Sequence, residues 1–398
     1  MKTHRRQFVR SGLVAGSAAI TNPFSFLSAC NAEAGKSISR VDGRLVVLYL
    51  EGGNDGLNTV IPKHDPFYQR SRTELAIDSS RLLSLDDGIG LHPSIRRLMT
   101  VWEQGRLAIV NNVGYPGHSR SHFLSRDVWH SGQLPEQVDL ASGWLGRAID
   151  PQQRTSHAPL AYSMSGHEPP HPLRGKFLRT SSAINCSAGE SNELRNLLAN
   201  AESPEPLTKD RKYANDLIKD TSEMLRSESN RNAKRPQTFP ATSLGQQLEQ
   251  VANLIQADLN AKVFYAVQTG YDTHAFQGVP HSILLKELGD ALAAFDECMH
   301  ELGLSSKVTT FVFSEFGRRV HENETGGTDH GAAGPVFIMG GPCRPGIHGT
   351  KVDLEHLDNG DLKVTTDFRS VYTTLLKTTL GVDSTSVSQF ELIQSLVG

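Results

Sequence analysis

Val308-Thr-Thr-Phe-Val-Phe313, followed by Ser314-Glu315-Phe316-Gly317-Arg318-Arg319, is the stretch that decides the fold. Its first six residues are apolar or β-branched and end at a turn signal, a pattern that predicts a buried strand of a parallel sheet. In open α/β sheets, ligands bind at the carboxyl ends of the strands. We therefore expect Glu315 and Arg318, which follow the strand, to lie at a functional edge.

The polar loop behind this strand closes on Gly326-Gly327-Thr328-Asp329-His330-Gly331. An adjacent carboxylate and imidazole on a glycine-flanked backbone are suitable ligands for a divalent metal ion. Asp329 and His330 are thus candidate metal ligands. The alternative is that Asp329 caps a turn and His330 is a surface histidine.

Other apolar runs predict strands that end in similar loops, and helical patterns alternate with them. The runs are residues 45–50, 107–110, 263–267 and 336–339. Alternating strands and helices predict an α/β fold with a doubly wound, mostly parallel sheet covered by helices on both faces. Because the carboxyl ends of parallel strands share one edge, the polar residues behind these runs are expected to form one site.

Three of these loops offer further metal ligands. Asp55 lies in the glycine-rich loop after residues 45–50, with Glu51 as its rival and a plain Asp-Gly turn as the alternative. Asp272 and His274 follow residues 263–267, and His348 follows residues 336–339.

The loop after residues 107–110 reads Gly114-Tyr-Pro-Gly-His-Ser-Arg-Ser-His-Phe123 and leads into a predicted helix. A hydroxyl at a helix N-terminus lies where backbone N–H groups favour an anion, so Ser119 or Ser121 could act as a nucleophile towards a phosphoryl or sulfuryl group. The alternative is that one of these serines only caps the helix.

Composition limits the class of protein. The chain has 398 residues, 38% hydrophobic and 21% charged, as in ordinary globular proteins. Its net charge of −3 gives no reason to expect a nucleic-acid partner. Beyond the N-terminus, no apolar run is long enough to predict a transmembrane span.

The N-terminus predicts export. Residues 1–29 carry the twin-arginine form His4-Arg5-Arg6-Gln7-Phe8 and a mildly apolar stretch, which indicates a signal peptide and a periplasmic or envelope location. Leu27-Ser28-Ala29-Cys30 resembles a lipobox, so Cys30 is either a lipid anchor or is removed by a later cleavage. Residues 30–40 read as a linker, and 41–398 as a single domain with a polar helical insertion around 190–245.

Five motifs together resemble a bacterial family, the domain of unknown function 1501. They are Gly-Gly-Asn-Asp-Gly-Leu-Asn-Thr (52–59), the loop 114–123, Tyr-Asp-Thr-His (271–274), Ser-Glu-Phe-Gly-Arg (314–318) and Gly-Thr-Asp-His-Gly (327–331). That family in turn resembles the alkaline phosphatase superfamily, which includes sulfatases. The resemblance implies an alkaline-phosphatase-like fold with one or two divalent ions at the strand ends. It implies Asp55, Asp272, His274, Asp329, His330 and His348 as the metal ligands, and Ser119 as the nucleophile.

These patterns predict an exported, metal-dependent hydrolase of phosphate or sulfate esters, acting on a small-molecule or glycan ester with zinc, manganese or calcium. Arg318 or Arg120 would neutralise the transferred group. The first alternative is a non-catalytic envelope protein that keeps part of the metal site to hold a ligand or a protein partner. A metal-free serine hydrolase is less favoured, because the Gly-x-Ser-x-Gly motif is missing.

Overall fold

The computed structural model describes residues 43–397, apart from 87, 157, 167, 183–237, 258–259 and 383–389. The predicted signal peptide, Cys30, the linker and residues 190–237 of the predicted insertion lie outside the described residues. No helix in the described part of the chain has the length and apolarity needed to cross a membrane.

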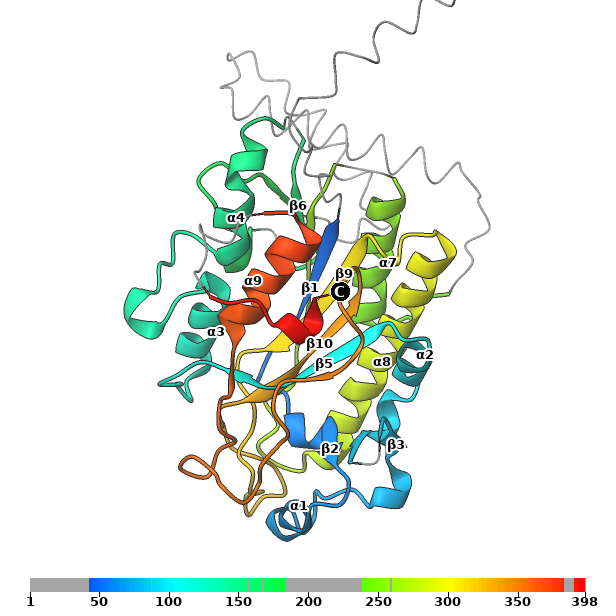
Figure 1. Cartoon of the computed structure of the whole chain (residues 1–398), viewed down its shortest axis with the longest axis vertical. Helices are drawn as coiled ribbons and strands as arrows, with labels where there is room; N and C mark the ends of the chain where they lie inside the picture. The colour runs from blue at the N-terminus through cyan, green and yellow to red at the C-terminus, as the bar shows by residue number, and fades with distance from the viewer. Residues whose placement is uncertain are drawn as a thin grey trace, which may run out of the picture. The chain divides into compact units, whose positions relative to one another are not determined.

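A large mixed sheet forms the centre of the molecule, as the sequence predicts (Figure 1). Its strands are β1 (Arg44–Leu50), β5 (Leu107–Gly114), β6 (Ala161–Ser163), β7 (Thr180–Ser182), β8 (Val263–Gln268), β9 (Val308–Ser314), β10 (Gly334–Gly340), β11 (Gly346–His348) and β12 (Thr366–Asp367). Their order is β11-β5-β10-β9-β1-β8-β6-β7, with β12 also on β5. A small second sheet joins β2 (Val60–Pro62), β4 (Ile89–Leu91) and β3 (Leu83–Ser84).

Strand β1 lies in the middle of the large sheet, between β9 and β8, and every one of its residues is buried. Alternate side chains point to opposite faces: Val46 and Leu48 belong to one apolar core, and Leu45 and Val47 to the other. A strand buried on both faces reads as a continuous apolar run, which is why the sequence signal was strong.

Helices cover both faces of the sheet, as the doubly wound prediction requires. On one face lie α2 (Leu98–Glu103), α7 (Ser243–Gln256) and α8 (Gly278–Glu301), and on the other lie α3 (His122–Ser131), α4 (Trp144–Gln153) and α9 (Phe368–Thr379) (Figure 1). A further short helix, α1 (Pro66–Ser71), packs in a smaller apolar cluster with the loops after β1 and β9.

The apolar periodicity of the longest helix explains its position. In α8, the side chains of Leu285, Leu288, Leu292, Phe295 and Met299 are buried, at the three- and four-residue spacing of one helix face. This face packs on the core that includes Val46 and Leu48 of β1. The helix thereby fixes the direction of the chain between the end of β8 and the start of β9.

One strand runs against the predicted direction. β10 pairs antiparallel with both β9 and β5, whereas the neighbouring pairs β1–β9, β1–β8 and β6–β8 are parallel. A parallel return needs a crossover connection, usually a helix, and no described helix separates β9 from β10. The carboxyl end of β10 therefore lies at the edge of the sheet opposite to the candidate site.

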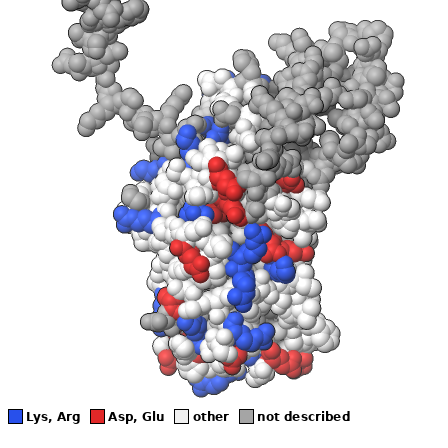
Figure 2. Space-filling model, turned by 90° about the vertical axis from the view of Figure 1, so that its right-hand side faces the viewer, with Lys and Arg blue, Asp and Glu red and all other residues white. Residues whose placement is uncertain are grey.

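Charge is distributed without a dominant sign on the face that Figure 2 shows, where Lys and Arg side chains alternate with Asp and Glu. A single-sign patch would favour a polyanionic partner such as nucleic acid. This face offers none.

Candidate metal centre

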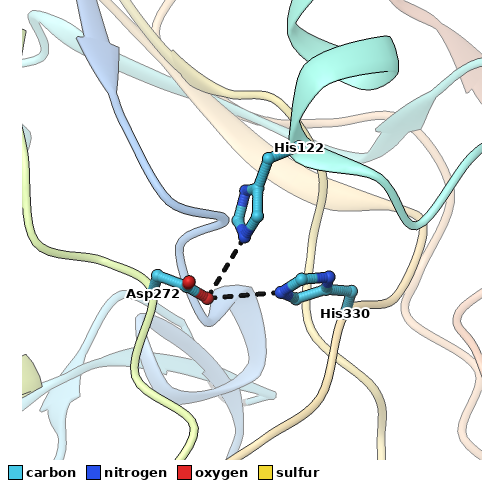
Figure 3. A group of neighbouring side chains, drawn as sticks. All are labelled: His122, Asp272 and His330. Atoms are coloured by element: carbon cyan, nitrogen blue, oxygen red, sulfur yellow. Dashed lines mark hydrogen bonds and ion pairs between the residues drawn. The ribbon is translucent and has the colours of Figure 1, made fainter.

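Loops at one edge of the sheet bring ionisable side chains together (Figure 3). His122 is the first residue of α3, behind β5. Asp272 and His274 follow β8, and Asp329 and His330 lie in the loop after β9. Because β5, β8 and β9 run in the same direction, their carboxyl ends meet at this edge.

The Asp272 carboxylate is the point on which three imidazoles converge. Its Oδ1 lies 3.2 Å from Nε2 of His122 and 3.2 Å from Nε2 of His330 (Figure 3). The same oxygen lies 3.0 Å from Nε2 of His274. One ligand atom each from His122, Asp272 and His330 falls within 4.8 Å of the other two, a spacing that a single metal ion can bridge.

The opposite nitrogen of two of these rings is already engaged. Nδ1 of His122 lies 2.8 Å from Oε1 of the buried Glu315, and Nδ1 of His330 lies 2.7 Å from the backbone oxygen of Arg120. An ionised carboxylate and a carbonyl only accept hydrogen bonds, so each Nδ1 must carry the proton. In the neutral rings, Nε2 then presents a lone pair towards Asp272. This is the arrangement of metal-binding histidines, whose outer nitrogen donates to a carboxylate or carbonyl.

His274 completes the group. Its Nδ1 lies 3.3 Å from Oδ1 of Asp329, and its Nε2 lies 2.8 Å from Nε2 of His330. Two lone pairs that face each other at this distance repel, unless a cation or a proton lies between them. A metal ion would remove the repulsion between these two nitrogens.

Of the three Nε2 atoms that face Asp272, the one on His122 lacks a well-formed hydrogen bond to a described residue. Nε2 of His122 is buried, and within the described residues it makes no hydrogen bond of good geometry. A buried polar atom without a partner is rare and calls for a water or an ion. The chain's own residues therefore fit a metal ion, which would bind His122, Asp272 and His330. Nε2 of His274 lies beside two of these ligand atoms and is the candidate for a fourth.

The electrostatics of the group keep its carboxylate ionised. Burial alone would raise the pKa of Asp272, but the hydrogen bond and the charge of Arg318 outweigh it and hold this pKa far below its ordinary value. The hydrogen bond to Glu315 raises the pKa of His122, whereas burial lowers the pKa of His330. In the metal-free protein, His122 thus takes up a proton more readily than His330.

Arg318 holds the loops of the centre together. Its side chain is fully buried, and its Nη2 donates to Asp272 at 2.8 Å. Its other acceptors are the backbone oxygens of Gly52, Gly53, Tyr271 and Thr328, and Nε2 of His274 at 3.4 Å. The sequence predicted that Arg318 neutralises a transferred group. In the structure, the N–H groups of Arg318 instead donate to acceptors of the chain itself, so Arg318 positions Asp272 and the surrounding loops.

Two glycines are required for this close packing. Gly52 has a φ of +118°, and a Cβ there would overlap the backbone nitrogen of Asp272. A Cβ on Gly327 would overlap the backbone of His274. Both positions let a neighbouring loop approach at backbone distance, which brings Glu315 and His330 within reach of the other ligands.

Three predicted ligands are not in the ligand set. Within the centre, Asp329 contacts only the outer nitrogen of His274, at 3.3 Å, and the other two lie elsewhere. Asp55 is 1% exposed, and its Oδ2 lies 2.5 Å from Nη1 of Arg72 and 2.5 Å from Nε2 of Gln277. The structure thus places Asp55 in an internal ion pair, because the tight turn at Gly52 and Gly53 carries the chain past the edge before Asp55 is reached.

His348 is displaced by the antiparallel direction of β10. It lies in β11 opposite Val110, well before the carboxyl end of β5 at Gly114. Its ring nitrogens contact Oγ of Ser395 and the backbone oxygen of Arg344, each at 3.0 Å. The predicted late histidine therefore belongs to the C-terminal packing of the sheet.

Comparison with known proteins gives the family. Residues 42–391 match the family described as "Protein of unknown function (DUF1501)". The chain belongs to this family. A search of curated proteins found no match.

Solved structures with similarity to the chain include members of the alkaline phosphatase superfamily. A superfamily protein from Vibrio parahaemolyticus is 10% identical, with a TM-score of 0.40, covering 87% of this chain and 68% of its own. Wild-type alkaline phosphatase PafA is 8% identical, with a TM-score of 0.44, covering 91% and 100%. The 2-O GAG sulfatase BT1596 is 9% identical, with a TM-score of 0.42, covering 89% and 74%. At such low similarity the chemistry must be argued from this chain's own residues.

The predicted nucleophile lies in the loop that leads to His122. Oγ of Ser119 accepts from the backbone N–H of Ser121 at 3.1 Å, and Ser121 is the residue before α3 without a capping bond from its side chain. Arg120, between them, holds His330 through its carbonyl, while its guanidinium donates to the buried Asp361 at 2.7 Å. The structure thus places Ser119, Arg120 and Ser121 next to the centre in sequence. The two serines bond to each other within their loop, whereas Arg120 contacts His330 and Asp361.

Two residues of the centre received no ligand or positioning role from the sequence. Glu315 was expected only at the functional edge, and His122 was read as part of the serine loop. Their signal was the position of each directly behind a strand or at a helix start. The contact between Glu315 and Nδ1 of His122 leaves Nε2 of that ring free to bind a metal. The sequence does not reveal this contact.

Proposed function

We propose that this protein is a metal-dependent hydrolase of phosphate or sulfate esters. The observation that carries the proposal is the convergence of three imidazole Nε2 atoms on one carboxylate oxygen, with each outer nitrogen held by an acceptor. Such a centre at the carboxyl edge of a parallel sheet is where α/β enzymes bind and convert ligands.

The donor set favours zinc or manganese over calcium. Calcium takes six to eight oxygen ligands, whereas three imidazoles and one carboxylate are usual ligands of zinc and related transition ions. We propose one ion, because Asp55 and His348 contact other parts of the fold. Asp329 then orients His274 from outside the centre.

The ion, when bound, would act as a Lewis acid on the ester oxygen. Glu315 and the Arg120 carbonyl hold His122 and His330 in the ligand tautomer. Arg318 keeps Asp272 ionised. Ser119 or Ser121 would supply the attacking hydroxyl, and the half-exposed Arg120 guanidinium could turn from Asp361 to the transferred group.

A second candidate is an envelope protein that binds a ligand without converting it. The observation that favours it is the hydroxyl of Ser119, whose hydrogen bond is with its own loop. Turnover needs nucleophile and metal in correct mutual geometry, whereas binding tolerates more.

Location is also proposed. The twin-arginine form of residues 1–29 supports export to the periplasm or envelope, and Cys30 is a lipid-anchor candidate. These residues lie outside the described part of the chain, so export and lipidation stay predictions from the sequence. Mass spectrometry of the mature N-terminus would decide between a lipidated Cys30 and a later cleavage.

The first test is an ester panel. The purified mature protein is stripped with a chelator, reloaded with zinc or manganese, and assayed on aryl and sugar phosphates and sulfates. We expect hydrolysis that the chelator abolishes and the metal restores. The His348→Ala variant, which alters a histidine outside the centre, should keep the activity. A metal-loaded protein that hydrolyses none of these esters would contradict the hydrolase and favour the binding protein.

A further inference from the structure

A cavity of about 890 Å3 opens beside the metal centre and takes no part in it. Its residues follow three parallel strands: Glu51 after β1, Ser165 after β6 and Thr269 after β8. Helix α3 contributes Arg126 and helix α7 contributes Gln247. The cavity therefore lies on the same carboxyl edge as the candidate metal ligands.

The cavity and the metal centre are formed by neighbouring residues of the same elements. Arg126 lies one helical turn beyond His122 on α3, so the two side chains share a helix face. Glu51 directly precedes Gly52, whose N–H donates to Glu315 at 3.0 Å. A molecule in the cavity can thus extend a group towards the ion that His122 and Asp272 would hold.

Charge disfavours an anion as the ligand of the cavity itself. Among the described lining residues, four carboxylates face two guanidinium groups. These are Glu51, Asp127, Glu168 and Glu287 against Arg126 and Arg174, a balance of −2. A phosphate or sulfate would be repelled by this lining, so the ester group must lie outside the cavity, towards the metal.

The lining matches a neutral group that both donates and accepts hydrogen bonds. Carboxylates and guanidinium groups both line the cavity, and Glu51 lies 3.9 Å from Arg126. The hydroxyl of Tyr49, which also lines the cavity, is buried and makes no hydrogen bond of good geometry with a described residue. Burial, and then the carboxylate of Glu315, raise the pKa of Tyr49, so this hydroxyl keeps its proton and can donate to Glu315 or to a ligand.

We propose that the cavity binds the alcohol part of the ester, and that this part is a sugar or a similar polyol. The proposal rests on the hydrolase function and adds to it the substrate class and the residues that select it. Sugar hydroxyls donate and accept at once, as the mixed lining demands, whereas an acyl chain would leave the charged groups unpaired. The volume lies in the upper range of small-molecule sites.

The test separates sugar binding from catalysis. Binding of glucose, galactose, N-acetylglucosamine and lactose to the metal-loaded full chain is measured by saturation-transfer NMR and calorimetry, with inorganic phosphate and glycylglycine as other ligand classes. The variants are Arg126→Gln and Glu51→Gln. The matched control is Arg97→Gln, which removes an exposed arginine of a surface ion pair with Glu297, outside the cavity.

We expect at least one sugar to bind, and each cavity variant to lose about tenfold or more of that affinity, the effect of one hydrogen bond to a charged group. Hydrolysis of 4-nitrophenyl phosphate or sulfate and the metal content should change by less than about twofold, within the range of surface substitutions. Arg97→Gln should change none of the three.

Three outcomes would overturn the proposal: no sugar binds, glycylglycine or phosphate binds at the cavity instead, or the cavity variants reduce aryl-ester hydrolysis as strongly as sugar binding. Failure of the hydrolase function gives a different result, because sugars would bind while no ester is hydrolysed.

Discussion

The Asp272→Asn variant is expected to lose metal-dependent hydrolysis by a factor of about 1,000 or more. Substitution of a residue that only supports a metal ligand typically lowers metal affinity or activity by about 10–100-fold. A larger loss is expected at Asp272, because it is the carboxylate on which three imidazoles converge. Asparagine keeps the size of the side chain but removes the charge that faces the three histidines. The measurement is kcat/KM on the best ester of the panel, at saturating metal.

The folded state should survive this change. Asp272 is half exposed, and Arg318 keeps its four backbone carbonyl partners. The control is Asp353→Asn, because Asp353 is another exposed aspartate in contact with a histidine, His356, at 3.0 Å. Asp353→Asn should keep full activity. An Asp272→Asn protein as active as the wild type would remove Asp272 from the centre.

The Asp55→Ala variant is expected to lower the free energy of unfolding by about 3–5 kcal/mol, because it leaves the guanidinium of Arg72 buried without its charge partner. Both side chains are almost fully buried, so solvent cannot replace the lost contact. Metal content per folded molecule should not change. Urea unfolding at neutral pH, with elemental analysis of the folded protein, measures both effects.

Acid should reduce this difference. Burial tends to raise the pKa of Asp55, but Arg72 lowers it by more, so the folded-state pKa is below its ordinary value. A depressed carboxyl pKa contributes stability above the unfolded-state value of about 4, and this contribution is lost as pH falls through the folded-state pKa. Wild type and Asp55→Ala should therefore converge in stability at acidic pH.

An exposed ion pair provides the control for Asp55. Asp290→Ala, which breaks the surface contact with Lys286, should cost at most about 1 kcal/mol. If Asp55→Ala instead lost its metal with unchanged stability, Asp55 would return to the ligand set that the sequence suggested.

The central strands were predictable because burial on both faces leaves a continuous apolar run. Residues 45–50 and 308–313 carry that signal, and the structure extends them only slightly, to Arg44–Leu50 and Val308–Ser314. The apolar run 336–339 also predicts a buried strand, but such a run does not tell whether the strand is parallel or antiparallel to its neighbours. The missing helical pattern between β9 and β10 was the available sign that the chain returns antiparallel.

In the candidate site, the predictable ligands are those whose loop follows a parallel strand and stays at the edge of the sheet. Asp272, His274 and His330 meet this condition, and the structure brings them together. Asp55 and His348 lie elsewhere, because a turn and an antiparallel strand intervene. The roles of His122 and Glu315 depend on a contact between residues far apart in the sequence, which no local pattern encodes.

The most direct test of the metal centre is a titration of the metal-free protein with zinc and manganese, with calorimetry and elemental analysis as readouts, for wild type, His122→Ala and His348→Ala. We predict one equivalent bound by wild type and by His348→Ala, and loss of tight binding in His122→Ala, because Nε2 of His122 is a buried nitrogen that makes no hydrogen bond of good geometry within the described residues. Equal binding by His122→Ala and wild type, or no binding by any of the three, would contradict the metal centre.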